Sequence, residues 1–145
     1  MAIVNPYLNF PGNTEEAFNF YKSVFGGEFA MLIRFKDSPE AGRVPEAEKE
    51  MIMHIALPFG KGNVLMGTDA LESMGHKVTP GSNFHLSVHT ESEAEATKIF
   101  NALAEGGKVT VPLANMPWGA FFGMLNDKFD IQWMVSYDPK YQNQG

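Results

Sequence analysis

Four histidines and the absence of cysteine define the chemistry open to this sequence of 145 residues. Without cysteine there are no thiolate nucleophiles, disulfides, iron–sulfur clusters or cysteine-based zinc sites. His54 and His85 fall in segments typical of strands, whereas His76 and His89 look like loop or strand-end residues. Because imidazole changes charge near neutral pH, His54 and His85 could orient a ligand or act as general bases. The alternative for each is a hydrogen-bonded or surface histidine without a functional role.

Side chains alternate between the two faces of a strand, so spacing predicts where these imidazoles point. Segment 83–89 is typical of a strand in which His85 shares a face with His89, while apolar residues take the other face. Segment 51–58 is also typical of a strand, and His54 lies on its less apolar face. We therefore expect both imidazoles on faces that turn toward a cavity.

The elements that carry the histidines occur twice along the chain. Each half has a strand, an amphipathic helix that ends at a Gly-Gly pair, and three further strands. Asn13 or Thr14 is expected to cap the first helix, and a capping box of Ser92 and Glu95 the second. This repetition predicts a duplicated β-α-β-β-β module. The expected strands are 4–10, 29–35, 51–58 and 63–67 in the first half and 83–89, 108–112, 120–126 and 131–136 in the second.

Charge and composition limit the partners of the chain. Its 11 Lys and Arg against 17 Asp and Glu give a net charge of −6, which disfavours nucleic acid and anionic membranes as partners. Hydrophobic residues make up 44% and charged residues 19%, as in ordinary globular proteins. No secretory signal and no apolar run long enough to span a bilayer is visible. A cytoplasmic protein is expected.

The length predicts one domain, residues 1–145. We expect module one at about 1–67, a linker at 68–82 and module two at about 83–137. Segment 36–50 is charged and contains two prolines. It is either a solvated loop or a lid over a site, because long loops in compact domains are often functional.

Aromatic and sulfur-containing side chains suggest what a cavity would accept. Trp118 and Phe122 lie near the start of an expected strand, and side chains of one parity there should line the cavity. Met66 and Met134 would make that lining adaptable, which suits an apolar or aromatic ligand. Trp133 is expected to pack in the core beneath a helix. Aromatic and methionine residues are also ordinary core residues, so the preference for such a ligand is an interpretation.

Four segments spread along nearly the whole chain carry recognisable motifs: 6–10 (PYLNF), 53–56 (MHIA), 118–123 (WGAFFG) and 127–134 (DKFDIQWM). In their order and spacing they resemble the PhnB-like branch of the vicinal oxygen chelate superfamily, which includes glyoxalase I, bleomycin-resistance proteins and extradiol dioxygenases. One departure is Asp130, which stands where the family usually has glycine in a turn. Aspartate tolerates such backbone conformations better than most residues, so the turn can survive.

The resemblance implies a fold and a place for a metal. Two tandem modules would form a curved mixed sheet around a cavity, with the helices outside, in a homodimer. Metal-dependent members hold a divalent cation at four strand positions, which correspond here to Pro6, Met66, Asn83 and Met134. Proline has no side-chain donor, methionine offers only a soft thioether, and asparagine alone could give a weak oxygen. We therefore expect no metal and no other cofactor.

The function expected from these features is binding of a small organic molecule, or acid–base chemistry on it, in a metal-free pocket. His54 and His85 would make polar contacts or act as catalytic residues; Trp118, Phe122, Met66, Asn83 and Met134 would bind the ligand. One alternative is a lyase, isomerase or dioxygenase that uses a divalent metal at a rearranged site. Another is a resistance protein that sequesters a drug. Some PhnB-like chains are described as ubiquinone-pathway methyltransferases, but this chain has no G-x-G-x-G loop for a nucleotide cofactor.

Overall fold

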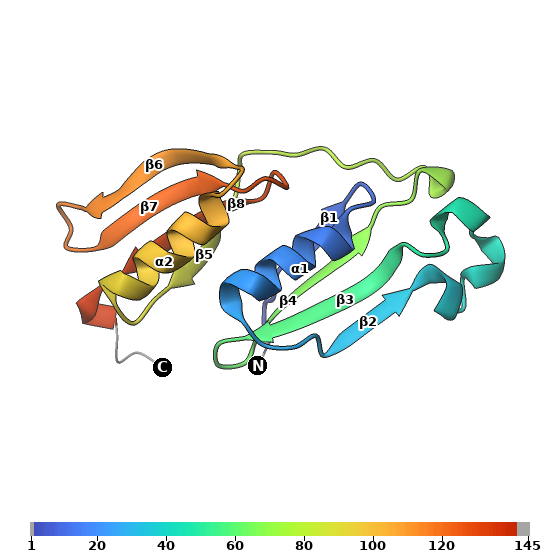
Figure 1. Cartoon of the computed structure of the whole chain (residues 1–145), viewed down its shortest axis with the longest axis horizontal. Coiled ribbons are helices and arrows are strands. Elements are labelled where there is room, and N and C mark those ends of the chain that lie inside the picture. Colours follow the sequence, from blue (N-terminus) through green and yellow to red (C-terminus); the bar gives the residue numbers. More distant parts are fainter. Residues whose placement is uncertain (1, 142–145) are drawn as a thin grey trace. The chain divides into compact units, whose positions relative to one another are not determined.

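The computed structural model describes residues 2–141. The chain consists of two compact units, Met1–Thr79 (unit 1) and Pro80–Gly145 (unit 2). Each unit has one α-helix and one four-stranded mixed sheet (Figure 1). Both follow the order β-α-β-β-β, which confirms the expected two-module α+β fold. Among the described residues, no helix is long and apolar enough to cross a membrane.

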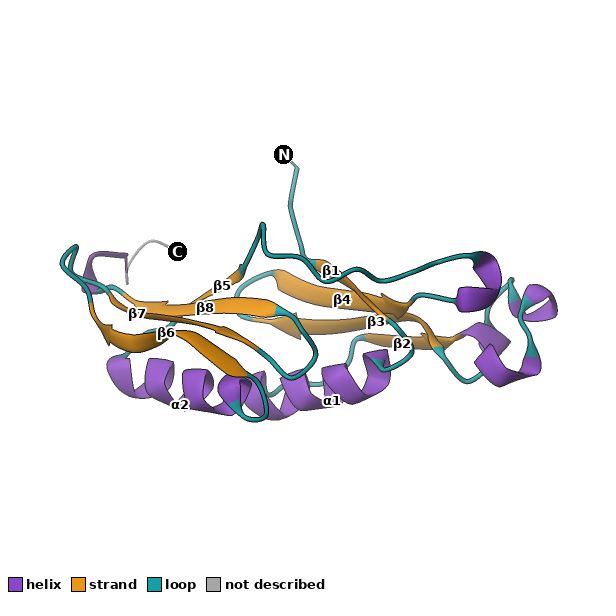
Figure 2. Cartoon of the chain, turned by 90° about the horizontal axis from the view of Figure 1, so that it is seen from above, coloured by secondary structure: helices purple, strands orange, loops and turns teal. Residues whose placement is uncertain are grey.

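Unit 1 packs helix α1 (Thr14–Phe25) against one face of its sheet, as Figure 2 shows. The burial of Ala17, Phe18 and Tyr21 follows from helical periodicity, because residues three or four apart share the face that meets the sheet. In the strand order β1-β4-β3-β2, β1 is parallel to β4 and the other pairs are antiparallel. The strands are β1 (Tyr7–Phe10), β2 (Met31–Arg34), β3 (Ile52–Phe59) and β4 (Asn63–Asp69).

A carboxylate distant in the sequence caps α1. Asn13 occupies the N-cap position as expected, but its side chain makes no capping hydrogen bond. Instead, Oδ1 of the buried Asp69 accepts hydrogen bonds from the backbone N of Thr14 at 3.0 Å and from its hydroxyl at 2.6 Å. Oδ2 of Asp69 accepts from the backbone N of Ile52 at 2.8 Å. Asp69 therefore joins the start of α1, the start of β3 and the end of β4.

Unit 2 repeats this architecture with helix α2 (Glu93–Ala104) and the strand order β5-β8-β7-β6. Ser92 caps α2 as expected, because its side chain accepts from the backbone N of Glu95 at 3.0 Å. Ala96, Phe100 and Leu103 form the buried stripe of the helix. The strands are β5 (Leu86–His89), β6 (Lys108–Asn115), β7 (Phe121–Asn126) and β8 (Gln132–Tyr137).

The turn between β7 and β8 forms around Asp127. Its Oδ1 accepts from the backbone N of Phe129 at 2.8 Å and of Ile131 at 3.1 Å. Its Oδ2 accepts from Nε1 of Trp133 at 2.8 Å, which fixes that indole in the core. Asp130 has a φ of 68°, so aspartate takes the left-handed conformation that the resemblance assigns to glycine.

Segment 36–50 is folded within unit 1. Phe35, Val44 and Leu71 form a small buried cluster. The carboxylate of Glu48 accepts a hydrogen bond from the hydroxyl of Ser73, which follows β4. The segment therefore packs against the residues that the sequence assigned to a linker at 68–82. Its short 3-10 helices are η1 (Phe35–Asp37), η2 (Ala41–Arg43) and η3 (Glu46–Glu48), and η4 (Glu72–Met74) lies in the expected linker.

Two strands of unit 2 differ in extent from the sequence prediction. β6 continues to Asn115 across Pro112, and its pairing with β7 is irregular between Val109 and Ala114. Proline has no backbone N–H for the ladder, and an edge strand such as β6 tolerates that loss at a bulge. β5 begins only at Leu86, so Asn83 lies in the exposed segment before the strand.

Candidate ligand-binding site

A pocket of about 470 Å³ lies in unit 2. Its lining comes from the end of β5, from β7 and β8, from the turn before β7, and from the residues after β8. All of these elements belong to one unit. We call it the unit 2 pocket; it is lined by His89, Trp118, Ala120, Phe122, Met134, Ser136, Asp138 and Lys140.

Strand register brings three of the lining residues into one row. His89 pairs with Ser136 across β5 and β8, and Ser136 pairs with Phe122 across β8 and β7. Residues of opposite parity, such as Trp133 and Val135, are buried in the core of the unit. The pocket therefore lies on the face of the sheet opposite α2.

Two hydroxyl groups hold the imidazole of His89. Its Nδ1 lies 3.1 Å from Oγ of Ser136, and its Nε2 lies 3.2 Å from Oγ of Ser87. A hydroxyl can donate or accept, so this arrangement suits either tautomer of the neutral ring. Ser136 is buried, whereas Ser87 and His89 are exposed. The pair of His89 and Ser136 thus supplies the polar part of the pocket.

An aromatic wall lies beside this polar part, because Phe122 neighbours Ser136 in the sheet. Trp118 and Phe122 meet edge to face, with ring centroids 5.9 Å apart. Trp118 is 58% exposed in the turn that joins β6 and β7. The turn is closed by a hydrogen bond from the backbone N of Gly119 to the carbonyl of Met116, and a φ of 100° at Gly119 requires glycine there. The fold therefore presents a large indole surface to solvent at a defined position.

Charged residues that follow β8 complete the rim. Oδ1 of Asp138 accepts a hydrogen bond from the backbone N of Lys140 at 3.0 Å, which shapes the short helix η5 (Pro139–Tyr141). Nζ of Lys140 lies 3.9 Å from the point where a Cβ on Gly119 would stand, beside Trp118. Neither rim residue was expected, because both lie beyond the last predicted strand and no local pattern marks them.

The structure brings together three of the expected site residues, Trp118, Phe122 and Met134. His85 and Asn83 precede β5 and are not among the residues that line the unit 2 pocket. The histidine in the pocket is His89, the last residue of β5, which the sequence pattern places in a loop or at a strand end. The sequence does contain a signal for His89, because strand alternation places its side chain on the same face as that of His85.

The other two expected site residues belong to unit 1. The ring of His54 stacks on that of Tyr7, with centroids 5.8 Å apart and planes at 30°. Tyr7 pairs with Met66 across β1 and β4, and Met66 pairs with Ala56 on β3. His54 and Met66 therefore share the face of the unit 1 sheet opposite α1.

The metal-ligand positions implied by the resemblance do not fit a hard divalent cation. Pro6 lies beside Met66, and its carbonyl accepts a hydrogen bond from the backbone N of Met66 at 3.1 Å. Met134 brings a thioether into the unit 2 pocket, and Asn83 lies outside the strand. Hard cations prefer oxygen donors, and borderline cations oxygen, imidazole or thiolate, the last of which this chain without cysteine cannot supply. Among residues 2–141, no three His, Asp or Glu side chains are grouped closely enough to hold a metal ion.

Two units with this strand order define a protein of the glyoxalase, bleomycin-resistance and dioxygenase fold class. A glyoxylase/bleomycin resistance protein/dioxygenase domain from Frankia sp. EAN1pec shares the fold with a TM-score of 0.63 at 14% identity, over 95% of this chain and 98% of that chain. The chain belongs to the family described as 3-demethylubiquinone-9 3-methyltransferase, which matches residues 2–136.

Individual relatives support this assignment. Protein PA1353 from Pseudomonas aeruginosa is 38% identical, with a TM-score of 0.84 over 95% of this chain and 98% of that chain. The PhnB protein from Bacillus cereus is 29% identical, with a TM-score of 0.75 over 94% and 99% of the two chains. Protein YjdN from Escherichia coli K12 is 27% identical over 142 residues, which cover 92% of this chain and 93% of YjdN. The resemblance to PhnB-like proteins is therefore confirmed.

Proposed function

We propose that the protein binds a small organic molecule with an aromatic or apolar body in the unit 2 pocket. The observation that carries the proposal is the pairing of an exposed aromatic wall with a buried hydroxyl and an imidazole in a hollow of about 470 Å³. Small-molecule sites typically combine a mostly apolar lining with a few placed polar groups and fall in this range of volume.

The apolar part of the pocket would supply most of the binding free energy. Trp118 keeps more than half of its surface in water, and Phe122, Ala120 and Met134 add further apolar lining. Covering such surface is favourable by about 25 cal/mol per Å². Met134 can adjust its three side-chain torsions to the shape of a ligand.

The polar part would orient the ligand. Ser136 and His89 already contact each other, so their positions are set before a ligand arrives. Preorganised groups lose little conformational entropy on binding. In this proposal His89, which lines the pocket, takes the role that the sequence suggested for His85. It would contact the ligand and would carry out any acid–base step.

Methyl transfer, which the family description names, is not part of the proposal. The chain lacks a G-x-G-x-G loop, and each sheet contains a single parallel strand pair in place of the doubly wound parallel sheet that holds a nucleotide. Metal-dependent chemistry is not part of the proposal either. The four positions that hold the metal in metal-dependent relatives carry unsuitable donors here, namely Pro6, Met66, Asn83 and Met134.

The two tryptophans of the chain provide the test. Trp118 lies in the pocket, whereas Trp133 is 1% exposed with its Nε1 bonded to Asp127. In ¹⁵N-tryptophan-labelled protein, 2-naphthamide should shift the Trp118 indole signal saturably and leave that of Trp133 in place. Trp118→Phe assigns the two signals. If aromatic amides and alcohols of this size leave the Trp118 signal unchanged up to millimolar concentrations, the proposal is wrong.

A further inference from the structure

We infer that the unit 2 pocket selects an organic anion, an aromatic carboxylate in particular, and that Lys140 binds the anionic group. The inference rests on the proposed function, since it names the class of molecule that the same pocket takes. It adds a specificity-determining residue that follows the last strand of the fold.

The position of Lys140 is the first support. The residue lines the pocket, and its Nζ lies 3.9 Å from the place of a Cβ on Gly119. Gly119 directly follows Trp118, so the ammonium lies at the aromatic end of the hollow. A planar ligand against the indole would bring a substituent at its edge within reach of this cation.

The absence of an ion-pair partner is the second support. Within the part of the chain that the structure describes, the salt bridges join other lysines and arginines to carboxylates, and none involves Lys140. Asp138 is the neighbouring carboxylate, and its Oδ1 accepts from the backbone N of Lys140 rather than from the ammonium. An incoming carboxylate would form a charge-assisted hydrogen bond without displacing an internal partner.

Asp138 is the carboxylate at the same rim, and one of its oxygens is already occupied by a backbone N–H. Its hydrogen bond to the backbone holds the turn that carries Lys140, so the carboxylate positions the lysine. A cation in the pocket would meet the ammonium of Lys140 at the same rim. The remaining polar groups, Ser136 and His89, are hydrogen-bonding groups that can bind other polar atoms of the ligand.

Matched probes distinguish charge from shape. 2-Naphthoate and 2-naphthamide share the same ring and nearly the same outline, but only the first is an anion at neutral pH. Titrations followed at the Trp118 indole signal should give about fivefold tighter binding of the carboxylate, the size expected of a partly exposed ion pair. Lys140→Gln should remove this preference and leave the affinity for the amide unchanged.

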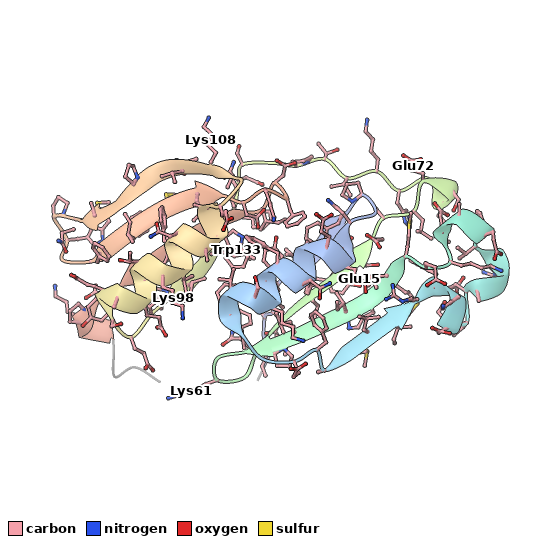
Figure 3. The ribbon with its side chains drawn as sticks, in the orientation of Figure 1. Glu15, Lys61, Glu72, Lys98, Lys108 and Trp133 are labelled. Atoms are coloured by element: carbon pink, nitrogen blue, oxygen red, sulfur yellow. The ribbon has the colours of Figure 1, made fainter. Side chains whose placement is uncertain are left out.

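Two further variants separate the local charge from general effects. Lys140→Arg should retain the preference, because it retains the cation. Lys98→Gln should also retain it, since Lys98 is exposed on α2 (Figure 3) and does not line the pocket, which lies on the face of the sheet opposite α2. Thermal unfolding of each variant confirms that the fold is kept.

The outcomes separate the two proposals. Equal binding of amide and carboxylate, or a preference that survives in Lys140→Gln, overturns the anion assignment while the binding function stands. Tighter binding of 2-naphthylmethylammonium than of the carboxylate also overturns the anion assignment, and it would make Asp138 the residue that contacts the charged group of the ligand. If no probe moves the Trp118 signal, the proposed function fails and this inference fails with it.

Discussion

The ring of Phe18 on α1 lies directly against the backbone of Gly67 on β4. A Cβ built on Gly67 would stand 2.7 Å from Cε1 of Phe18 and 3.2 Å from the carbonyl oxygen of Leu8. Real Cβ atoms essentially never come as close to another atom as 2.7 Å, and the ring of Phe18 is fully buried in a densely packed core. Glycine at this position therefore sets how closely α1 packs on its sheet.

Gly67→Ala should lower the free energy of unfolding by about 1–3 kcal/mol, because the added methyl group overpacks the contact with Phe18. Urea denaturation measures the change. Gly42→Ala is the matched control: a Cβ there meets nothing within 4 Å, and its effect should stay within about 0.5 kcal/mol. Equal stability of the two variants would show that the sheet yields to the helix at Gly67.

The ion pair between Glu15 and Arg34 predicts a pH-dependent term in stability. Oε1 of Glu15 lies 3.0 Å and Oε2 2.7 Å from the guanidinium nitrogens of Arg34, and Glu15 is on α1 (Figure 3). The hydrogen bonds from Arg34 lower the pKa of the Glu15 carboxyl below its ordinary value. A lowered pKa in the folded state means stabilisation above the unfolded-state pKa, lost as the pH falls through the folded-state pKa.

Glu15→Gln should therefore reduce the free energy of unfolding by about 0.5–1 kcal/mol at neutral pH, a modest value because solvent screens the partly exposed pair. The difference from wild type should disappear in acid, once Glu15 is protonated in both states. Urea denaturation at a series of pH values checks this, with Glu16→Gln on the same helix turn as control. A difference that persists undiminished in acid would contradict the ion-pair origin.

Substitutions at His89 and His85 test which histidine contributes to ligand binding in the unit 2 pocket. His89→Gln should weaken the binding of 2-naphthamide about fivefold, because it disturbs the contact with Ser136 that organises the polar part. His85→Gln should leave the affinity within twofold of wild type, since His85 does not line the pocket. Calorimetry on both variants decides the matter, and a larger loss at His85 would favour the assignment suggested by the sequence.

Local patterns in the sequence were sufficient to predict the helices and strands of the two modules. Helical periodicity and the capping box at Ser92 predicted α2 correctly, because both depend on residues within a few positions of each other. Alternation along strands was sufficient to predict Trp133 in the core. The left-handed turn at Asp130 followed from its position in a motif of the family. These features depend on backbone geometry that neighbouring residues specify.

Tertiary structure alone decided the features that join distant residues. The sequence places Thr14 at the start of a helix, but its capping partner Asp69 is 55 residues away. That His89 rather than His85 lines the unit 2 pocket depends on where β5 begins and on its register with β8. Lys140 enters the pocket only because η5 turns toward the β6–β7 turn that carries Gly119. Strand parity is a local property, whereas register and the path of the chain after its last strand depend on packing of the whole unit.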